Sequence, residues 1–169
     1  MELNWLLEIQ RSLTSPAADP VMIAVSTLGN HGLIWIAVAL ALCLSPRWRR
    51  AGLGMLTALL IAHLAGNVLL KNLVARPRPY VAYPDLPLRI PRLNEFSFPS
   101  GHTIAAFAAV FSLPAALGTL KRALAVLAVV MGCSRLYLFM HYPSDVLGGA
   151  LIGLLIGAGV ARWPWFSVK

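Results

Sequence analysis

The stretch "FPSGHTIAAFAAVFSLPAALGTL" (residues 98–120) joins a polar start to a long apolar run. From residue 103 to residue 120 the run approaches the length of about 20 mostly apolar residues that a membrane span needs. Immediately before it, Ser100 can cap a helix, Gly101 leaves the backbone bare, and His102 places an ionisable ring beside hydrocarbon. The stretch therefore predicts a membrane helix whose N-terminal end has a chemical role.

The composition of the whole chain supports a membrane protein. Of its 169 residues, 59% are hydrophobic and only 12% are charged, whereas a soluble domain carries about 25% charged residues. No hydrophilic stretch is long enough to fold separately, so we expect one integral membrane domain over residues 1–169. The net charge of +8 is distributed in a way that favours membrane topology and anion binding, and we expect no nucleic-acid partner.

Five stretches have the length and apolar character of membrane spans: 20–44, 51–73, 103–120, 123–140 and 145–160. The segment "LKR" (120–122) predicts a tight turn between the third and the fourth. The first 13 residues, "MELNWLLEIQRSL", have an amphipathic pattern that suits a helix lying in the membrane interface. We therefore predict an all-α, polytopic transmembrane helical bundle with five spans plus an N-terminal interfacial helix, six helices in total. A sixth span in place of the interfacial helix is the alternative.

The one long polar connection, residues 74–100, sets the predicted orientation. Its repeated prolines exclude helix and predict an ordered, extended loop. If the spans alternate, all six acids fall on the side of this loop, and the other side carries seven bases without an acid: Arg47, Arg49, Arg50, Lys121, Arg122, Arg162 and Lys169. Lys and Arg mark the cytoplasmic side. We expect a bacterial inner or plasma membrane protein with the loop facing the exterior and the C-terminus in the cytoplasm.

Polar side chains from three separate parts of the chain fall on the same side as this loop. The spans bring them to one membrane depth, although alternation of the helices could equally have scattered them over both sides. They are Lys71 and Arg78, then Ser100, Gly101 and His102, and finally Arg135, His141 and Asp145.

The first property of this set is a capacity to bind phosphate. Lys71, Arg78 and Arg135 are three cations without enough acids nearby to neutralise them, and cations near lipid usually mark function. The arginine fork matches phosphate oxygens, and the start of a helix offers unpaired N–H groups to an anion. Gly101 allows an oxyanion to approach the backbone, and the Ser100 hydroxyl can donate. The sequence therefore predicts a phosphate cradle.

The two histidines provide the chemistry of bond breaking. Asp145 follows His141 by four residues, and Pro143 suits the first turn of a helix that would bring the acid back to the ring. An acid on one ring nitrogen leaves the other free to attack phosphorus, and His102 could protonate the leaving alkoxide. No set of residues at metal-ligand spacing accompanies them, so we expect neither a metal nor another cofactor.

Simpler explanations exist for each part of this set. Cations at span ends can reach the interface as ordinary snorkelling residues, a polar helix start can be a plain cap, and a histidine with an acid can be a local ion pair. For His31 and His63 we expect a hydrogen bond to a neighbouring helix. For Arg76, Arg89 and Arg92 we expect solvated loop charge.

The three blocks together resemble the type 2 phosphatidic acid phosphatase superfamily over about residues 50 to 160. Its signature of K-x6-R-P, P-S-G-H and S-R-x5-H-x3-D matches Lys71 to Pro79, Pro99 to His102, and Ser134 to Asp145. The resemblance implies a helical bundle, a phosphohistidine intermediate on His141 and metal independence. It implies that His102 is the acid and that Asp145 orients the nucleophile. The phosphate ligands that it implies are Lys71, Arg78, Ser100, Gly101 and Arg135.

The function expected from these observations is a metal-independent lipid phosphatase that cleaves a terminal phosphate from a membrane lipid (di)phosphate. Its partners would be that substrate and membrane lipids, and the oligomeric state is not predicted. We favour undecaprenyl diphosphate, which would give undecaprenyl phosphate. Phosphatidylglycerol phosphate, phosphatidic acid and lipid A 1-phosphate are the rivals. A vanadate-dependent haloperoxidase-like enzyme and a lipid-phosphate carrier without turnover are the alternatives of other classes.

Overall fold

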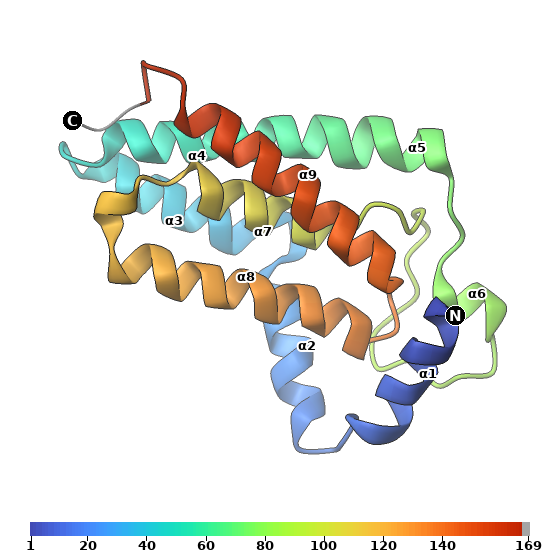
Figure 1. Cartoon of the computed structure of the whole chain (residues 1–169). Helices are drawn as coiled ribbons and strands as arrows, with labels where there is room; N and C mark the ends of the chain where they lie inside the picture. The colour runs from blue at the N-terminus through green and yellow to red at the C-terminus, as the bar shows by residue number, and fades with distance from the viewer. Residues whose placement is uncertain (167–169) are drawn as a thin grey trace.

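The computed structural model describes residues 1–166, which form helices and loops without a strand (Figure 1). This confirms the predicted all-helical class. The principal helices are α1 (Glu2–Ser12), α2 (Ala18–Leu28), α3 (Leu33–Leu44), α4 (Arg49–Ala62), α7 (Gly101–Ser112), α8 (Thr119–Tyr137) and α9 (Pro143–Ala161). Shorter elements connect them: η1 (Asn30–Gly32), the π-helix η2 (His63–Leu70), α5 (Lys71–Val74), α6 (Pro79–Ala82) and η3 (Ala115–Leu117).

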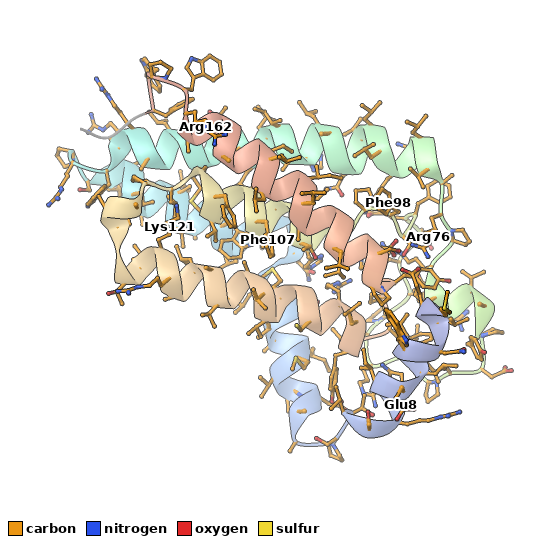
Figure 2. All side chains as sticks on the ribbon, in the orientation of Figure 1. Glu8, Arg76, Phe98, Phe107, Lys121 and Arg162 are labelled. Atoms are coloured by element: carbon orange, nitrogen blue, oxygen red, sulfur yellow. The ribbon has the colours of Figure 1, made fainter. Side chains whose placement is uncertain are left out.

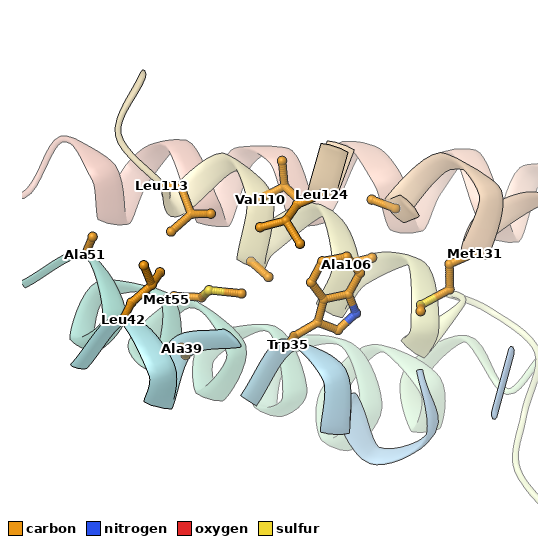
Figure 3. Close-up of a cluster of buried hydrophobic side chains, with 12 residues drawn as sticks. Trp35, Ala39, Leu42, Ala51, Met55, Ala106, Val110, Leu113, Leu124 and Met131 are labelled. Atoms are coloured by element: carbon orange, nitrogen blue, oxygen red, sulfur yellow. The ribbon is translucent and has the colours of Figure 1, made fainter. Parts of the chain in front are cut away.

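Helix α7 is the centre of the bundle, because α3, α4, α8 and α9 all contact it (Figure 1). The largest buried cluster lies between α3, α4, α7 and α8 and includes Trp35, Met55, Val110, Leu113 and Met131 (Figure 3). Each of these side chains is at most 1% exposed. In a bilayer such close packing supplies van der Waals contact that lipid chains cannot match, so it holds the helices together.

Glycines in α9 allow this helix to lie against the backbone of α7. A Cβ atom at Gly153 would be 2.5 Å from the Ile104 carbonyl oxygen, and one at Gly157 would be 2.6 Å from the Ala108 carbonyl oxygen. Any larger residue would push the two helices apart. The close approach also joins the starts of the two helices, where the Ser100 N–H donates to the Asp145 carbonyl oxygen at 3.1 Å.

Two helical stretches are long and apolar enough to cross a membrane, Arg49–Ala82 and Pro143–Ala161. A third candidate is the pair Asp19–Leu28 and Asn30–Leu44, which is bent by 49°. Helix α7 is apolar but has only 12 residues. The helices thus suit a membrane protein, while the count of five spans plus an interfacial helix stays a prediction.

Two local predictions are wrong. The chain does not turn at residues 120–122, since Lys121 and Arg122 lie in the first turn of α8. The turn comes earlier, where Pro114 prevents helix from continuing and Gly118 adopts a φ of +53°. The proline-rich loop is not wholly extended either, because Pro79 begins the single helical turn α6.

The charged residues separate toward the two ends of the bundle as the sequence predicts. Lys121 and Arg162 lie at one end, while Glu8 and Arg76 lie at the other, beside the long loop (Figure 2). Lys169 lies outside the described residues. Which end faces the cytoplasm stays a prediction.

Candidate active site

A cavity of about 580 Å³ lies at the end of the bundle that carries the long loop, between η1 and α3 on one side and α4, η2 and α7 on the other. Six of the eight predicted site residues line it: Lys71, Arg78, Gly101, His102, Arg135 and His141. Ser100 and Asp145 do not line the cavity. They lie directly behind it, and neither is exposed. The structure therefore brings both histidines and all three predicted phosphate-binding cations to one cavity.

A break between α2 and α3 opens this cavity. His31 and Gly32 have φ values of +53° and +71°, and the two helices meet at 49°. Helix α3 packs against α4, whereas α2 packs against α8. The two parts of the first predicted span thus diverge from each other, and this separation leaves space beside η2.

Arg135 shows most directly what the cavity can bind. Its side chain is 1% exposed, and its Nη1 donates to the Ser26 hydroxyl. Within residues 1–166, its Nε and Nη2 atoms have no hydrogen-bond partner. Leaving a buried charged donor unsatisfied costs at least about 1–3 kcal/mol, so such groups normally have a hydrogen-bond partner. An anion in the cavity would satisfy both nitrogen atoms.

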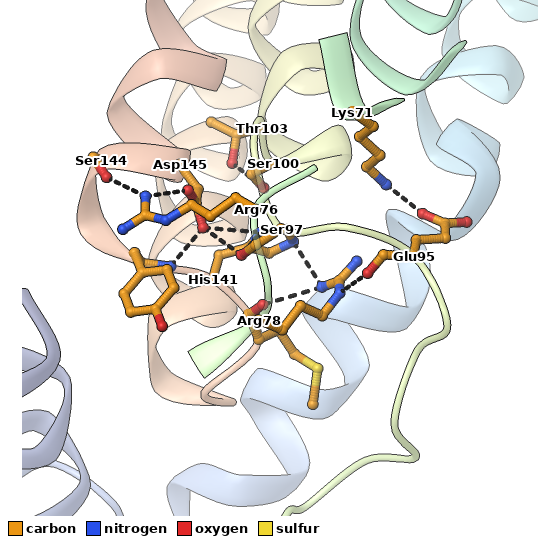
Figure 4. Close-up of polar contacts among 12 residues, drawn as sticks. Lys71, Arg76, Arg78, Glu95, Ser97, Ser100, Thr103, His141, Ser144 and Asp145 are labelled. Carbon is orange, nitrogen blue, oxygen red and sulfur yellow. Dashed lines mark hydrogen bonds and ion pairs between the residues drawn. The ribbon is translucent and has the colours of Figure 1, made fainter. Parts of the chain in front are cut away.

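The other two cations contact the long loop. Of the three cations, only Lys71 forms an ion pair with a described residue, which agrees with the prediction that nearby acids are too few to neutralise them. Lys71 forms an ion pair with Glu95, and the Arg78 Nε donates to the Glu95 carbonyl oxygen at 2.7 Å (Figure 4). Arg78 also donates from Nη1 to the Met140 carbonyl oxygen at 3.0 Å. The hydrogen bond from Lys71 holds the pKa of Glu95 below its usual value, so Glu95 is ionised at neutral pH. Glu95 therefore pairs with Lys71, a cation that a bound phosphate would need.

The start of α7 has the form expected of an anion site. Ser100 is its N-cap residue, and the Ser100 hydroxyl accepts a hydrogen bond from Thr103 Oγ1 at 2.9 Å. A Cβ atom at Gly101 would be 2.6 Å from the Asn67 Oδ1, so a larger residue here would displace the Asn67 side chain. The N–H groups of this first turn have no partner within the helix and can bind an oxyanion.

His141 lies between a carboxylate and the cavity. Its Nδ1 is 3.6 Å from the Asp145 Oδ2, and its Nε2 is 3.2 Å from the Arg78 Nη1 (Figure 4). Burial lowers the pKa of His141 to about 3, so the ring is neutral at neutral pH. With the acid on the Nδ1 side, the lone pair of Nε2 is directed toward the phosphate-binding cations.

Ser97 is a residue that the sequence analysis missed. Its hydroxyl donates to the Asp145 Oδ2 and lies 3.5 Å from the His141 Nδ1, and the residue is fully buried. It thus connects the acid and the histidine across their 3.6 Å separation. Ser97 precedes the P-S-G-H block by two residues, and its sequence context resembles that of any loop serine.

Arg76 is not the solvated loop charge that we expected. Its Nη1 donates to the Asp145 Oδ1 at 2.7 Å, and its Nη2 donates to the Glu2 Oε2 at 2.7 Å. Its guanidinium lies 3.9 Å from the centre of the Tyr142 ring. Glu2 in turn accepts from the Ser144 N–H at 3.0 Å, which caps the start of α9. Arg76 therefore links the catalytic candidate Asp145 to the N-terminal helix.

The other two loop arginines also have partners. Arg89 donates to the Asp19 Oδ1 at 2.7 Å, and Arg92 donates to the Pro84 carbonyl oxygen at 2.7 Å. The prediction of solvated charge is wrong for Arg89, which binds α2 to the loop. The sequence signal that could have identified these pairs is the placement of all six acids on the same side as the loop.

His102 is oriented by the end of α2. Its Nε2 lies 3.1 Å from both the Ser26 carbonyl oxygen and the Asn30 Oδ1. Two oxygen acceptors at this nitrogen favour a proton there, which leaves Nδ1 to exchange a second proton. Ser26 thus contacts both Arg135 and His102, although it lies in no signature block.

Within the part of the chain that the structure describes, His63 has its hydrogen-bond contact in its own helical run and none with a neighbouring helix. Its Nδ1 lies 3.2 Å from the Asn67 Nδ2, one turn further along the same helical run. Both His31 and His63 line the cavity. The prediction of a helix-to-helix hydrogen bond is therefore wrong for His63.

Comparison with known proteins now identifies the family. The model of the PAP2 superfamily matches residues 47–169. The chain belongs to the PAP2 superfamily. The match contains all eight predicted site residues and excludes α1, α2 and α3.

Curated PAP2 relatives have phosphatase names. The chain is 35% identical over 159 residues to the decaprenylphosphoryl-5-phosphoribose phosphatase of Mycobacterium tuberculosis, which covers 93% of this chain and 87% of that protein. It is 29% identical over 134 residues to the undecaprenyl-diphosphatase of Sulfolobus acidocaldarius, covering 79% of this chain and 64% of the relative.

Two solved structures are also similar. The PAP2-type phosphatidylglycerolphosphate phosphatase of Bacillus subtilis aligns with a TM-score of 0.74 at 28% identity, covering 94% of this chain and 82% of that one. LpxE of Aquifex aeolicus aligns with a TM-score of 0.81 at 26% identity, covering 96% and 95%. With its apolar helices, this PAP2 chain is an integral membrane protein.

Proposed function

We propose that this PAP2 protein is a lipid phosphatase that removes the terminal phosphate of a polyprenyl-linked (di)phosphate lipid. The observation that carries the proposal is the buried, half-satisfied guanidinium of Arg135 in a cavity shared by His102 and His141. Leu56 and Leu59 are among the apolar residues that line the same cavity. A charged end and an apolar wall together fit a lipid that bears a phosphate.

In the proposed reaction, Arg135, Arg78 and Lys71 bind the phosphate oxygens together with the first N–H groups of α7. The His141 Nε2 attacks phosphorus while the bond to the leaving oxygen breaks. For this step His102 must carry a proton on both ring nitrogens, and it gives the leaving oxygen the proton of Nδ1. A water molecule then attacks the phosphohistidine, gives its proton to His102, and releases phosphate with a neutral His141.

Asp145 has a supporting role in this scheme. Its carboxylate lies on the Nδ1 side of His141 and stabilises the positive charge that the ring gains when Nε2 bonds to phosphorus. Fixed cations take the place that metal ions have in many phosphoryl transfers. We therefore propose a reaction without a metal or another cofactor.

The substrate class rests on the relatives as well as on the cavity. The sequence alone favours undecaprenyl diphosphate, and relatives named for that lipid are among those found. Relatives that are 35–37% identical over longer matches, of 127 and 159 residues, are named for a polyprenyl-linked sugar phosphate instead. A polyprenyl chain is common to both names, so we propose this tail for the substrate. Phosphatidylglycerol phosphate is a second candidate, since a solved relative is named for it.

Release of phosphate from purified protein in detergent tests the proposal. With a chelator present, the wild-type protein should release phosphate from a polyprenyl diphosphate, vanadate should inhibit it, and His141→Ala should abolish it. Thr57→Val is a matched control, because Thr57 donates only to the Leu53 carbonyl oxygen of its own helix. Lipid binding without release would support a carrier, and halide oxidation with vanadate would support the haloperoxidase alternative.

We also propose that the cavity faces the exterior and that the C-terminus is cytoplasmic. The bases at the end opposite the cavity support this orientation. A C-terminal tag should therefore be inaccessible to a protease added to intact cells, and cleavage of that tag would contradict the orientation.

A further inference from the structure

The cavity contains polar side chains that the proposed hydrolysis does not use. His63 and Asn67 lie one turn apart on η2, and Lys71 follows by one further turn. Residues four apart on a helix are neighbours on one face, and all three line the cavity. A π-helix is rare and frequently lies at a functional site.

The hydrogen bond between His63 and Asn67 leaves one donor and one acceptor that could bind a ligand. The Asn67 Nδ2 donates to the His63 Nδ1 at 3.2 Å, which places the proton of a neutral His63 on Nε2. The Asn67 Oδ1 is buried and accepts no hydrogen bond from any described residue. A hydroxyl group both donates and accepts, so it complements this pair.

His31 supplies a third polar group from η1, which forms another wall of the cavity. It is a residue other than glycine with φ at +53°. A residue other than glycine in this conformation is uncommon, although histidine adopts it more readily than most, and such positions often occur at functional sites. The His31 side chain thus lines the same cavity as His63 and Asn67.

His63 and Asn67 form a polar wall of the cavity, and their order along one helical run shows where this wall lies. Leu56, Leu59 and Leu60 come first, His63 and Asn67 follow, and Lys71 comes last, all lining the cavity. Each four residues advance a helix by about 6 Å. Asn67 is also next to Gly101, where the phosphate cradle begins. A ligand along this run would thus contact the leucines first, then the polar wall, and finally the cations.

The charges do not favour a second phosphate at the polar wall. The charged residues among those lining the cavity are Lys71, Arg78, Glu95 and Arg135. They lie at the same end as His141, while Asn67 provides an uncharged amide. A second phosphate beside that amide would lie away from these cations, which is unfavourable.

We propose that His31, His63 and Asn67 form a subsite for a neutral, hydroxyl-bearing headgroup between the terminal phosphate and the apolar tail. This inference rests on the proposed phosphatase function and narrows its substrate. It favours a lipid whose terminal phosphate is carried by a polyol or a sugar over a simple lipid diphosphate.

A matched pair of substrates tests the subsite. Phosphatidylglycerol phosphate carries one free hydroxyl next to its terminal phosphate ester, and the analogue built on 1,3-propanediol lacks only that hydroxyl. Wild-type kcat/KM should favour the hydroxyl-bearing lipid by about tenfold, the effect of one well-paired buried hydroxyl. In His63→Ala and Asn67→Ala this ratio should fall to about twofold or less, while release from the analogue is largely retained.

A control variant and the alternative outcomes distinguish failure of the subsite proposal from failure of the proposed phosphatase function. Thr57→Val, on the same helical run but outside the cavity lining, should keep the wild-type ratio. Equal use of both lipids by the wild type, equal losses on both in the variants, or preference for farnesyl diphosphate over both would overturn the subsite and leave the phosphatase intact. No release from any of the three lipids by wild-type protein would overturn the proposed function itself.

Discussion

Replacement of Arg76 by alanine should damage both stability and turnover, although Arg76 does not line the cavity. It holds Asp145, which is fully buried, through an ion pair of 2.7 Å. Removing one partner of a buried ion pair costs about 3–5 kcal/mol. The Arg76 side chain is 28% exposed, and Asp145 keeps hydrogen bonds from Ser97 and the Tyr142 N–H. A loss of about 2–3 kcal/mol is therefore expected.

That loss corresponds to a fall in Tm of about 5–10 °C for a chain of this size. Since Arg76 holds one oxygen of the carboxylate, its removal should let Asp145 rotate away from His141. A displacement near 1 Å costs about 100-fold in turnover, so kcat should fall by about this factor with KM little changed.

Thermal unfolding in detergent and phosphate release would measure the two effects. Arg92→Ala is the matched control, because Arg92 lies in the same loop, is exposed, and donates to the Pro84 carbonyl oxygen. It should change stability by less than about 0.5 kcal/mol. If Arg76→Ala kept kcat within twofold of wild type while His141→Ala abolished it, the role of Arg76 in positioning Asp145 would be refuted.

Three further predictions concern the cavity. Glu95→Gln removes the anion that pairs with Lys71, so phosphate and vanadate should inhibit up to about fivefold more strongly; an unchanged inhibition constant would contradict this. Asn30→Ala removes one acceptor from the His102 Nε2 and should lower kcat about tenfold, with a shifted alkaline limb in the pH profile; a change in KM alone would argue against it. Because burial lowers the pKa of His141 from 6.5 to about 3, the unfolded chain binds a proton below pH 6.5 that the folded chain does not. Acidification from pH 7 to pH 5 should therefore cost about 2 kcal/mol of stability, and His141→Gln should reduce that loss in thermal unfolding.

The sequence predicts the residues that line the cavity better than it predicts the residues that hold them in position. Lys71, His102 and Arg135 stand at the ends of strongly apolar runs, so helix length alone places them at one depth. The contacts of Ser26 with Arg135 and His102 join residues 109 and 76 positions apart. No local pattern encodes such pairs, because they depend on how the helices pack.

Two departures from regular helix could not be predicted from the sequence. Helix propensity and hydropathy gave no sign of the left-handed His31 or of the π-helix that begins at His63. Both features arise inside apolar runs that read as continuous spans. They also place the two histidines, which we assigned to helix packing, in the wall of the cavity. The departures from regular helix thus fall at the site rather than in the core.

Residues near the N-terminus contact the candidate active site even though the family match begins at residue 47. Glu2 holds Arg76 and caps the start of α9, Ser26 holds Arg135, and Asn30 holds His102. Each of these supports contacts either a residue of the three signature blocks or the arginine that binds Asp145. If the signature residues carry the chemistry as proposed, residues of α1, α2 and η1 orient them. Changes in these first helices can therefore alter turnover while every signature residue remains in place.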